Sequence, residues 1–472
     1  MAFKELHVDV PETPPLQVRP NLFEEIKETS ERLIHLVMVA TKPDIIKQLP
    51  VYLELRRQGK FALLGHTGQH YDWNLSGALH EEFQVRPDFI LNIRGSLYQK
   101  IAQIIERLGF VVSKFRQEAP DKVLLPYVHG DTTTAAAGGV ACYNSSAPVV
   151  HVEAGLRTLT PSVDLLEKIV KDEISVEAFY EQLRQRELWE KGSSEPFPEQ
   201  FDTRTAATVS GVHLAPVQLN QQNLLDEGFP ADRISVVGNT VSDSLQIALR
   251  KAETSKIYER YPILEEGSVV RFCVHRRGNI VSKHRFKVLF DSVIRLVEGG
   301  YTVLWIALGG TFAALRAFSL EKKILRFAEK HPSLVFSEVW PYYNDVIRVM
   351  KDCAAIATDS GSIQEEANIL HVPCATLRFN SDRPETLIAG ANVLAPPITP
   401  DVVFRVIHEV VENKGMNQQM RNIPNLYGEN VSAKIIDFTM QVAETQRVFR
   451  WEQERLGFSD RDDWEPGETT YL

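Results

Sequence analysis

The stretch Leu124–Arg157, LLPYVHGDTTTAAAGGVACYNSSAPVVHVEAGLR, decides the fold that we expect for this chain. An apolar run leads into Gly130-Asp131, small helix-forming residues follow, and Pro148 begins a second apolar run. This pattern predicts strand, sharp turn, helix, turn and strand. Each predicted strand ends on an acid, Asp131 and Glu153. In a parallel α/β unit both acids lie at the carboxyl edge of the sheet, where open α/β folds bind ligands, so the stretch predicts two carboxylates facing one crevice.

Length and composition indicate a globular protein with more than one core. The chain has 472 residues, which favours two or more domains. Its hydrophobic content of 44% and charged content of 24% are typical of globular proteins. With 52 Lys and Arg against 62 Asp and Glu, the net charge is −10. This balance argues against a nucleic-acid binder but leaves room for a local basic pocket that binds phosphates.

Cysteine usage and apolar segments predict a cytoplasmic location. The most apolar window, Tyr301–Phe318, is interrupted by Gly309-Gly310 and contains Arg316, so we expect a buried strand, turn and helix and no membrane span. The N-terminus has acids and prolines where a secretory signal has a basic start and an apolar block. The four cysteines are widely scattered and lack the spacing of metal ligands, so we expect free thiols in a reducing compartment. They are Cys142, Cys273, Cys353 and Cys374.

The first half begins with a proline-rich arm at residues 1–32, followed by a predicted strand at Leu33–Ala40 and a helix that ends at Arg57. Lys42 and Lys47 lie near the start of this helix, where free backbone amides and the helix dipole favour a phosphate. The alternative is that both lysines decorate a solvated helix.

A polar loop follows the next predicted strand, Phe61–His66. His66 and His70 could form a metal pair, but the helical i, i+4 argument fails in a glycine-containing loop. We therefore interpret Gln69 and His70 as parts of a loop that faces the substrate. A predicted helix over Ser96–Leu108 precedes the opening stretch.

An unusual charged segment, Ser162–Lys191, follows the second acid and is bounded by Pro161 and Gly192. It predicts an inserted helix or pair of helices, which could be a partner surface, an active-site cover or a solvated decoration. Beyond it, Glu199 lies on a proline-fixed turn before another helix. We place the domain boundary at about residue 242.

The second half repeats the strand–helix rhythm. A strand at Val269–Val274 ends in His275-Arg276, and a later strand at Ala354–Ala357 leads into Ser360-Gly361-Ser362. A turn of small residues at a helix N-terminus is a good phosphate site, because backbone amides can approach closely.

Charged residues surround this predicted phosphate site. Glu365 and Glu366 could cap the helix or hold the hydroxyls of a ribose, and physics alone leaves both readings open. Arg378 and Arg383 bring two cations beside Ser360, so a diphosphate between them makes electrostatic sense. A final helix from Ser432 to about Leu456 precedes an acidic tail that we expect to be disordered.

Seven motifs carry a resemblance to a known family, in the family's order and over roughly residues 33–440 apart from the insertion. They are His129-Gly130-Asp131-Thr132-Thr133-Thr134, His151-Val152-Glu153-Ala154-Gly155-Leu156-Arg157-Thr158, Pro198-Glu199, Gly238-Asn239-Thr240, His275-Arg276-Arg277, Asp359-Ser360-Gly361 with Gln364-Glu365-Glu366, and Arg383-Pro384-Glu385. With these motifs the chain resembles the UDP-N-acetylglucosamine 2-epimerase family, of the non-hydrolysing type.

The resemblance implies an α/β fold of two Rossmann-like domains that face each other across a cleft, as in glycosyltransferase-B proteins. The expected division is an arm at 1–32, a first domain at 33–242 with the insertion at about 162–191, and a UDP-binding domain at 243–430. Residues 431–472 are expected to form a helix that crosses back to the first domain and then the acidic tail. It also implies a reaction without cofactor or metal. A base removes the proton at C2 while UDP leaves C1, and the resulting 2-acetamidoglucal is reprotonated and takes UDP back.

The resemblance assigns site residues by position. The catalytic positions are Asp131, Glu153, Glu199 and His275, and which carboxylate performs which step stays open. The UDP-sugar positions are Lys42, Lys47, Gln69, His70, Arg276, Ser360, Gly361, Ser362, Glu366 and Arg383. The implied partners are the UDP-sugar and a second copy of the chain in a homodimer, with no nucleic acid or membrane, in a role in cell-envelope polysaccharide synthesis.

Some positions depart from the family pattern. The family's Thr-Arg-Pro-Glu is Thr41-Lys42-Pro43-Asp44 here, so a forked guanidinium becomes a point charge. The other departures are Gln200 for a second glutamate, Asp202-Thr203 for Asn-Arg, Gly278 for an acid, Ser362 for a glycine, and Leu308-Gly309-Gly310-Thr311 for a His-Pro-Asn-Pro turn. Since all four catalytic positions remain acidic or imidazole, we expect altered substrate choice rather than lost activity.

Three other functions compete with a non-hydrolysing epimerase. A hydrolysing 2-epimerase would release UDP and free N-acetylmannosamine. A UDP-sugar-binding regulator or partner subunit would keep the pocket without turnover, as the substitutions and the insertion suggest. A glycosyltransferase fits the fold but does not explain Asp131, Glu153 and Glu199 together.

Overall fold

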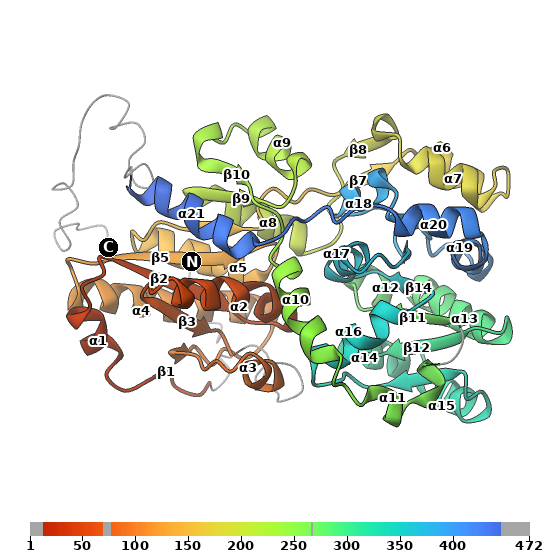
Figure 1. Cartoon of the computed structure of the whole chain (residues 1–472), viewed down its shortest axis with the longest axis horizontal. Helices are drawn as coiled ribbons and strands as arrows, with labels where there is room; N and C mark the ends of the chain where they lie inside the picture. Colours follow the sequence, from red (N-terminus) through yellow and green to blue (C-terminus); the bar gives the residue numbers. More distant parts are fainter. Residues whose placement is uncertain (1–12, 69–76, 266–267, 445–472) are drawn as a thin grey trace, which may run out of the picture.

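Two parallel sheets flanked by helices form the protein (Figure 1). The computed structural model describes residues 13–68, 77–265 and 268–444. The first sheet has the order β1-β4-β3-β2-β5-β6-β9-β10 and is parallel except where β1 pairs with β4. Its strands are β1 (Gln17–Val18), β2 (Leu33–Val39), β3 (Ala62–His66), β4 (Phe89–Ile90), β5 (Val123–His129), β6 (Val150–Val152), β9 (Val212–Ala215) and β10 (Ile234–Val236).

The second sheet is wholly parallel, with the order β13-β12-β11-β14-β15-β16. Its strands are β11 (Val269–Cys273), β12 (Thr302–Ile306), β13 (Leu334–Ser337), β14 (Ala355–Thr358), β15 (Cys374–Thr376) and β16 (Asn392–Leu394). The two parallel sheets confirm the predicted α/β class. Near-continuous burial of strands such as β2, β5 and β11 follows from helices that cover both faces.

Helices associated with the first sheet include most of those before residue 253. They are α1 (Leu22–Glu28), α2 (Lys42–Arg57), α3 (Ala78–Glu82), α4 (Leu97–Glu118), α5 (Thr133–Asn144), α8 (Glu199–Thr208), α9 (Gln218–Asp226), α10 (Val241–Ala252) and, from the C-terminal end of the described chain, α21 (Val431–Glu444). The helix predicted over Ser96–Leu108 continues to Glu118, because Val111, Val112 and Phe115 extend its buried face.

The second sheet carries the remaining helices. They are α11 (Ile257–Arg260), α12 (Arg277–Ile280), α13 (Lys283–Glu298), α14 (Gly309–Ala317), α15 (Glu321–Lys330), α16 (Tyr343–Asp352), α17 (Gly361–Ile369), α18 (Pro384–Ala389), α19 (Pro400–Glu412) and α20 (Lys414–Arg421). Beyond α20 the chain returns to the first sheet, where α21 packs against α2 and β9 (Figure 1). Val431, Ile435 and Ile436 are fully buried there, as the predicted crossover helix requires.

Residues 13–32, which were expected to be an arm, are joined to the first sheet. β1 pairs antiparallel with β4, and Leu22 and Ile26 of α1 are buried in the core of this part of the molecule. None of the helices in the described part of the chain combines the length and the apolar character that a bilayer crossing needs.

The insertion is helical, as predicted, but it belongs to the core beside the second sheet. It contains α6 (Val163–Val170), α7 (Val176–Leu183) and β8 (Trp189–Lys191), and β8 pairs antiparallel with β7 (Leu159–Pro161) just before the insertion. Phe179 and Leu183 are fully buried in that core, and the Tyr180 hydroxyl donates to the Gly390 carbonyl at 2.7 Å. Figure 1 shows α6 and α7 beside α19 and α20. A purely solvated decoration is therefore the wrong reading for its apolar face.

Candidate functional site

A cleft of about 510 Å³ lies between the two sheets and takes its walls from both of them. It receives the loops after β5, β6, β11 and β14, in agreement with ligand binding at the carboxyl ends of parallel strands. The cleft brings together most residues that the sequence singled out: Lys42, Lys47, Asp131, Glu153, Glu199, His275, Arg276, Ser360, Ser362, Glu366 and Arg383.

Two glycines and a left-handed backbone conformation position the side chains of Asp131 and Glu153. Gly130 has φ 62°, and a Cβ there would come within 2.8 Å of Glu153 Oε2. Glu153 itself has φ 61°, a conformation that costs a non-glycine residue about 1–2 kcal/mol. Gly155 follows at φ 84°, and a Cβ there would lie 2.2 Å from the Asn220 carbonyl oxygen. The close contacts at Gly130 and Gly155 leave no room for a larger side chain, which explains the glycine in each of the two motifs.

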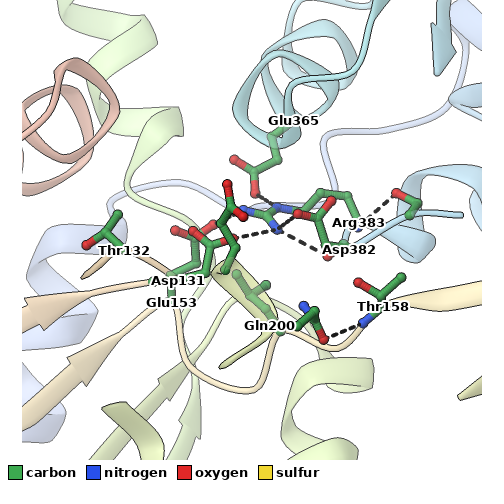
Figure 2. Close-up of polar contacts among 12 residues, drawn as sticks. Asp131, Thr132, Glu153, Thr158, Gln200, Glu365, Asp382 and Arg383 are labelled. Carbon is green, nitrogen blue, oxygen red and sulfur yellow. Dashed lines mark hydrogen bonds and ion pairs between the residues drawn. The ribbon is translucent and has the colours of Figure 1, made fainter. Parts of the chain in front are cut away.

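Glu153 pairs with three cationic or potentially cationic side chains in the cleft. Its Oε1 lies 2.8 Å from Lys47 Nζ, 2.8 Å from Arg383 Nη2 and 3.1 Å from Asn239 Nδ2. Its Oε2 lies 2.8 Å from His129 Nε2. Burial alone would raise the pKa of Glu153, but Lys47, Arg383 and His129 lower it well below its ordinary value. Glu153 is therefore an ionised carboxylate at neutral pH. It pairs with Lys47 beside the first sheet and with Arg383 beside the second, and the contact with Arg383 is drawn in Figure 2.

Asp131 differs from Glu153 in its freedom to react. Its Oδ2 is buried without a hydrogen-bond partner, and its nearest cation is Arg383 Nη1 at 4.0 Å. Burial raises the pKa of Asp131 from 3.8 to about 6, against the opposing effect of Arg383 and Arg276. A carboxyl with a pKa near neutrality and a free oxygen is suited to proton transfer.

Glu199 enters the cleft from the first residue of α8. It forms an ion pair with Arg276 Nη1, while its Oε2 is buried without a hydrogen-bond partner. Arg276 Nη2 lies 3.3 Å from Asp382 Oδ2, so the Arg276 guanidinium bridges Glu199, beside the first sheet, and Asp382, beside the second. Glu199 thus presents one free oxygen to the cleft, as Asp131 does.

His275 follows β11 and lines the cleft as a neutral imidazole. Its backbone N–H donates to the Asp359 carboxylate at 3.0 and 3.2 Å, and its Nδ1 lies 3.6 Å from Asp359 Oδ1. Burial lowers the pKa of His275, although Asp359 opposes this change. A neutral ring can accept or donate a hydrogen bond at neutral pH.

The predicted phosphate site lies at the N-terminus of α17. Ser360 is the N-cap residue, and Ser360 and Ser362 line the cleft. A Cβ at Gly361 would come within 3.3 Å of Arg276 Nη2 and of Arg383 Cζ. Two guanidinium groups therefore reach a helix N-terminus that glycine keeps open, and this arrangement favours an anion.

The two glutamates of α17 do not cap this helix. The helix begins at Gly361, and no acid lies in its first turn. Glu365 Oε2 lies 2.6 Å from Lys47 Nζ, and its Oε1 pairs with Arg383. Glu366 lines the cleft and accepts a hydrogen bond from the Tyr343 hydroxyl at 2.9 Å. The reading of these two glutamates as helix caps is therefore wrong.

The two lysines of α2 are buried, so their reading as solvated decoration is also wrong. Lys47 is 1% exposed between two carboxylates. Lys42 lines the cleft and donates to the Trp340 carbonyl at 3.0 Å, and burial lowers its pKa to about 8. Gln69 and His70 lie outside the described residues, and so does the metal pair considered for His70.

Two departures from the family pattern lie away from the cleft lining. Gln200 Oε1 accepts the Thr158 backbone N–H at 3.1 Å (Figure 2). The glutamate that the family has at this position could accept the same hydrogen bond, so Gln200 preserves this contact with the turn before the insertion. Gly278 lines a smaller cavity of about 270 Å³ beside Arg276, together with Glu195 and Arg285. The acid that the family has there would meet both side chains.

Several residues in or beside the cleft were not predicted as site residues from the sequence. His129 and Asn239 lie within the quoted motifs, but only the folded chain shows that they contact Glu153. Arg271 lies in β11 and Tyr343 is the first residue of α16. The sequence of both elements indicated core packing, yet both side chains line the cleft. Asp202 was noted only as a departure, yet it lines the cleft one turn after Glu199.

The chain is similar to known proteins over most of its length. The family model for UDP-N-acetylglucosamine 2-epimerase matches residues 54–185 and 190–440. The UDP-N-acetylglucosamine 2-epimerase of Neisseria meningitidis is 29% identical over 417 residues, which cover 86% of this chain and 98% of the relative. The enzyme of the same name from Methanocaldococcus jannaschii is 28% identical over 405 residues, 85% of this chain and 96% of the relative.

Solved structures agree with the sequence comparison. The crystal structure of the Neisseria meningitidis UDP-GlcNAc 2-epimerase bound to UDP-GlcNAc has a TM-score of 0.71 and 26% identity, and it covers 87% of this chain and 100% of its own. The Methanocaldococcus jannaschii enzyme in complex with UDP-GlcNAc and UDP has a TM-score of 0.69 and 25% identity, with 87% and 99% covered. These neighbours share the glycosyltransferase-B-like arrangement that was predicted. The chain belongs to the UDP-N-acetylglucosamine 2-epimerase family of isomerases.

Proposed function

We propose that this protein interconverts UDP-N-acetylglucosamine, or a close derivative, with its manno epimer without net hydrolysis. The observation that carries the proposal is the meeting, in one cleft, of two carboxyls with free buried oxygens and a helix N-terminus with two guanidinium groups. Relatives whose names and titles include UDP-GlcNAc support the choice of substrate.

UDP would occupy the side of the cleft formed by the second sheet. Its diphosphate would lie at the N-terminus of α17, where Ser360, Arg276 and Arg383 supply donors. Glu366, with one oxygen held by Tyr343, would accept from the ribose hydroxyls. Charge-assisted donors on the diphosphate also stabilise it as a leaving group.

The sugar would then lie against Asp131 and Glu199. In one direction, a carboxylate takes the C2 proton, the C–H electron pair forms the C1=C2 double bond, and the C1–O bond breaks with its electrons on UDP. The other carboxyl then protonates C2 from the opposite face while a UDP oxygen rebonds to C1. In the reverse direction the two acids exchange roles, as microscopic reversibility requires. Glu153 holds Lys47 and Arg383 in place throughout.

Product analysis tests the proposal. Incubation with UDP-N-acetylglucosamine should give a mixture of UDP-linked gluco and manno sugars, measured by ³¹P and ¹H NMR, with no accumulation of free UDP. Stoichiometric UDP and free N-acetylmannosamine would mean a hydrolysing enzyme. UDP binding with neither product, for this and related UDP-HexNAc sugars, would mean a binding protein and would contradict the proposal.

A further inference from the structure

Glu82, the last residue of α3, joins the two halves of the molecule. Its Oε2 accepts a hydrogen bond from the Tyr343 backbone N–H at 3.0 Å, and its Oε1 accepts one from the Asn344 backbone N–H at 3.2 Å. The helix α3 lies beside the first sheet, whereas Tyr343 and Asn344 are the first two residues of α16 beside the second. A carboxylate from one half therefore binds the start of a helix in the other.

The start of α16 depends on this contact, because its own N-cap residue supplies no cap. That residue is Tyr342, and it makes no side-chain cap hydrogen bond. The first backbone N–H groups of a helix have no partner within the helix, and the helix dipole favours a carboxylate beside them. Glu82 supplies this cap through hydrogen bonds that its charge strengthens.

Lys42, also beside the first sheet, holds the turn just before α16. Its ammonium group donates to the Trp340 carbonyl at 3.0 Å and to the Pro341 carbonyl at 3.4 Å. The first half of the molecule thus presents a cation to the carbonyl groups and an anion to the N–H groups of one short segment, residues 340–344. These hydrogen bonds fix the backbone on both sides of Tyr342 and at Tyr343 itself.

Tyr343 connects this segment with the second-sheet side of the cleft. It is 3% exposed, and its hydroxyl donates to Glu366 Oε1 at 2.9 Å. Both Tyr343 and Glu366 line the cleft. Because a closely packed ring has little room to move, the position of the Tyr343 backbone sets the position of its hydroxyl. A path of direct contacts therefore runs from Glu82 through Tyr343 to the Glu366 carboxylate.

We propose that Glu82 is a positioning residue for the nucleotide: it fixes Tyr343, and Tyr343 fixes the Glu366 carboxylate against the ribose hydroxyls. The inference rests on the proposed function, because it takes the ribose to lie at Glu366. Glu82 is not among the residues that line the cleft. Its effect therefore falls on the affinity for UDP and on KM, while kcat, which depends on Asp131 and Glu199, stays close to the wild-type value.

The UDP affinities of single and double variants test this path. In isothermal titration calorimetry, Glu82→Ala should weaken UDP binding about tenfold, and Tyr343→Phe, which removes the hydroxyl, should weaken it to a similar extent. The double variant should bind UDP about as weakly as either single variant, since both changes break the same path. The matched control is Glu81→Ala at the exposed neighbour of Glu82 on α3, which should bind UDP like the wild type.

The double variant separates positioning from a role in the fold alone. Losses of affinity that add up in the double variant would show that Glu82 acts by another route, and wild-type affinity in Glu82→Ala would give it no role; either result overturns the inference. If circular dichroism shows that Glu82→Ala is unfolded, Glu82→Gln replaces it. That amide keeps one acceptor oxygen and should weaken UDP binding about threefold, again without additivity, and unchanged affinity would overturn the inference.

Steady-state kinetics give a second readout. For Glu82→Ala, KM for the UDP-sugar should rise about tenfold while kcat stays within about twofold of the wild-type value. A kcat that falls as far as kcat/KM would assign Glu82 to the chemical step and overturn the inference. Failure of the wild type to form any epimer would instead contradict the proposed function, and the affinity test with UDP would keep its meaning.

Discussion

The Lys47 ammonium group lies 2.6 Å from Glu365 Oε2, and this contact joins α2 beside the first sheet to α17 beside the second. Lys47 Nζ also lies 2.8 Å from Glu153 Oε1. Arg383 pairs with the same two carboxylates (Figure 2), so two cations and two anions form one buried ionic cluster. This ionic cluster takes residues from both sheets, so neither sheet could form it alone.

Replacement of Lys47 by Met should destabilise the protein by about 3–5 kcal/mol, because it leaves buried Glu153 and Glu365 short of a cation. The free energy of unfolding, from urea titration at pH 7, measures this effect. Lys168→Met is the control, since Lys168 forms only an exposed pair with Asp164 and should change stability by less than about 0.5 kcal/mol. Equal stability of the two variants would contradict the account of the cluster.

The value of kcat/KM should fall at alkaline pH, with an apparent pKa near 6. The reaction needs one proton on the pair formed by Asp131 and Glu199. Burial raises the pKa of Asp131 to about 6, so the protonated form of this carboxyl is lost as the pH rises through that value. Above pH 6 the fall should be about tenfold per pH unit. A flat profile from pH 5.5 to about 8.5 would exclude Asp131 as the holder of this proton.

Gly361→Ala should weaken UDP binding by about tenfold or more, because the added Cβ presses on Arg276 and Arg383 at the phosphate site. Isothermal titration calorimetry with UDP gives the affinity. The matched control is Gly309→Ala at the start of α14, where a Cβ would meet no atom within 4 Å. If both variants bind UDP like the wild type, the diphosphate does not lie at this helix end.

Phe179→Ala should destabilise the core beside the second sheet by about 3–5 kcal/mol, because Phe179 of the insertion is fully buried there. Hydrogen exchange should show lost protection in α19 and β16, which contact α7, and little change in β2 and β5. Val163→Ala, at a position 67% exposed, is the control. Loss of protection confined to the first sheet would show that the insertion supports that sheet instead.

The sequence was sufficient for the fold and for most residues of the cleft, because periodic strands and glycine turns are local features. Glu153 and Gly155 were recognisable in one motif, and the positive φ at both positions explains its form. The insertion was placed by sequence within the first half, yet its buried face packs beside the second sheet. That partner is set by long-range packing of residues such as Phe179, which periodicity cannot reveal.

The sequence also could not distinguish the roles of the carboxyl groups in the cleft. Glu153 and Asp131 look equivalent in their motifs, and the difference between them comes from neighbours distant in the chain. Glu153 is surrounded by Lys47, Arg383 and His129, whereas Asp131 retains a free oxygen. Asp202 was visible only as a mismatch, because its contact with Thr133 spans 69 positions of sequence.

The most direct test of the central claim is ¹H NMR of the protein with UDP-N-acetylglucosamine in heavy water. If the cleft removes and returns the C2 proton, deuterium should enter C2 of both epimers during turnover, and Asp131→Asn should slow this exchange by about 10² to 10⁴ while UDP still binds. Formation of the manno epimer with its C2 proton retained, or equal exchange in the wild type and Asp131→Asn, would contradict the account.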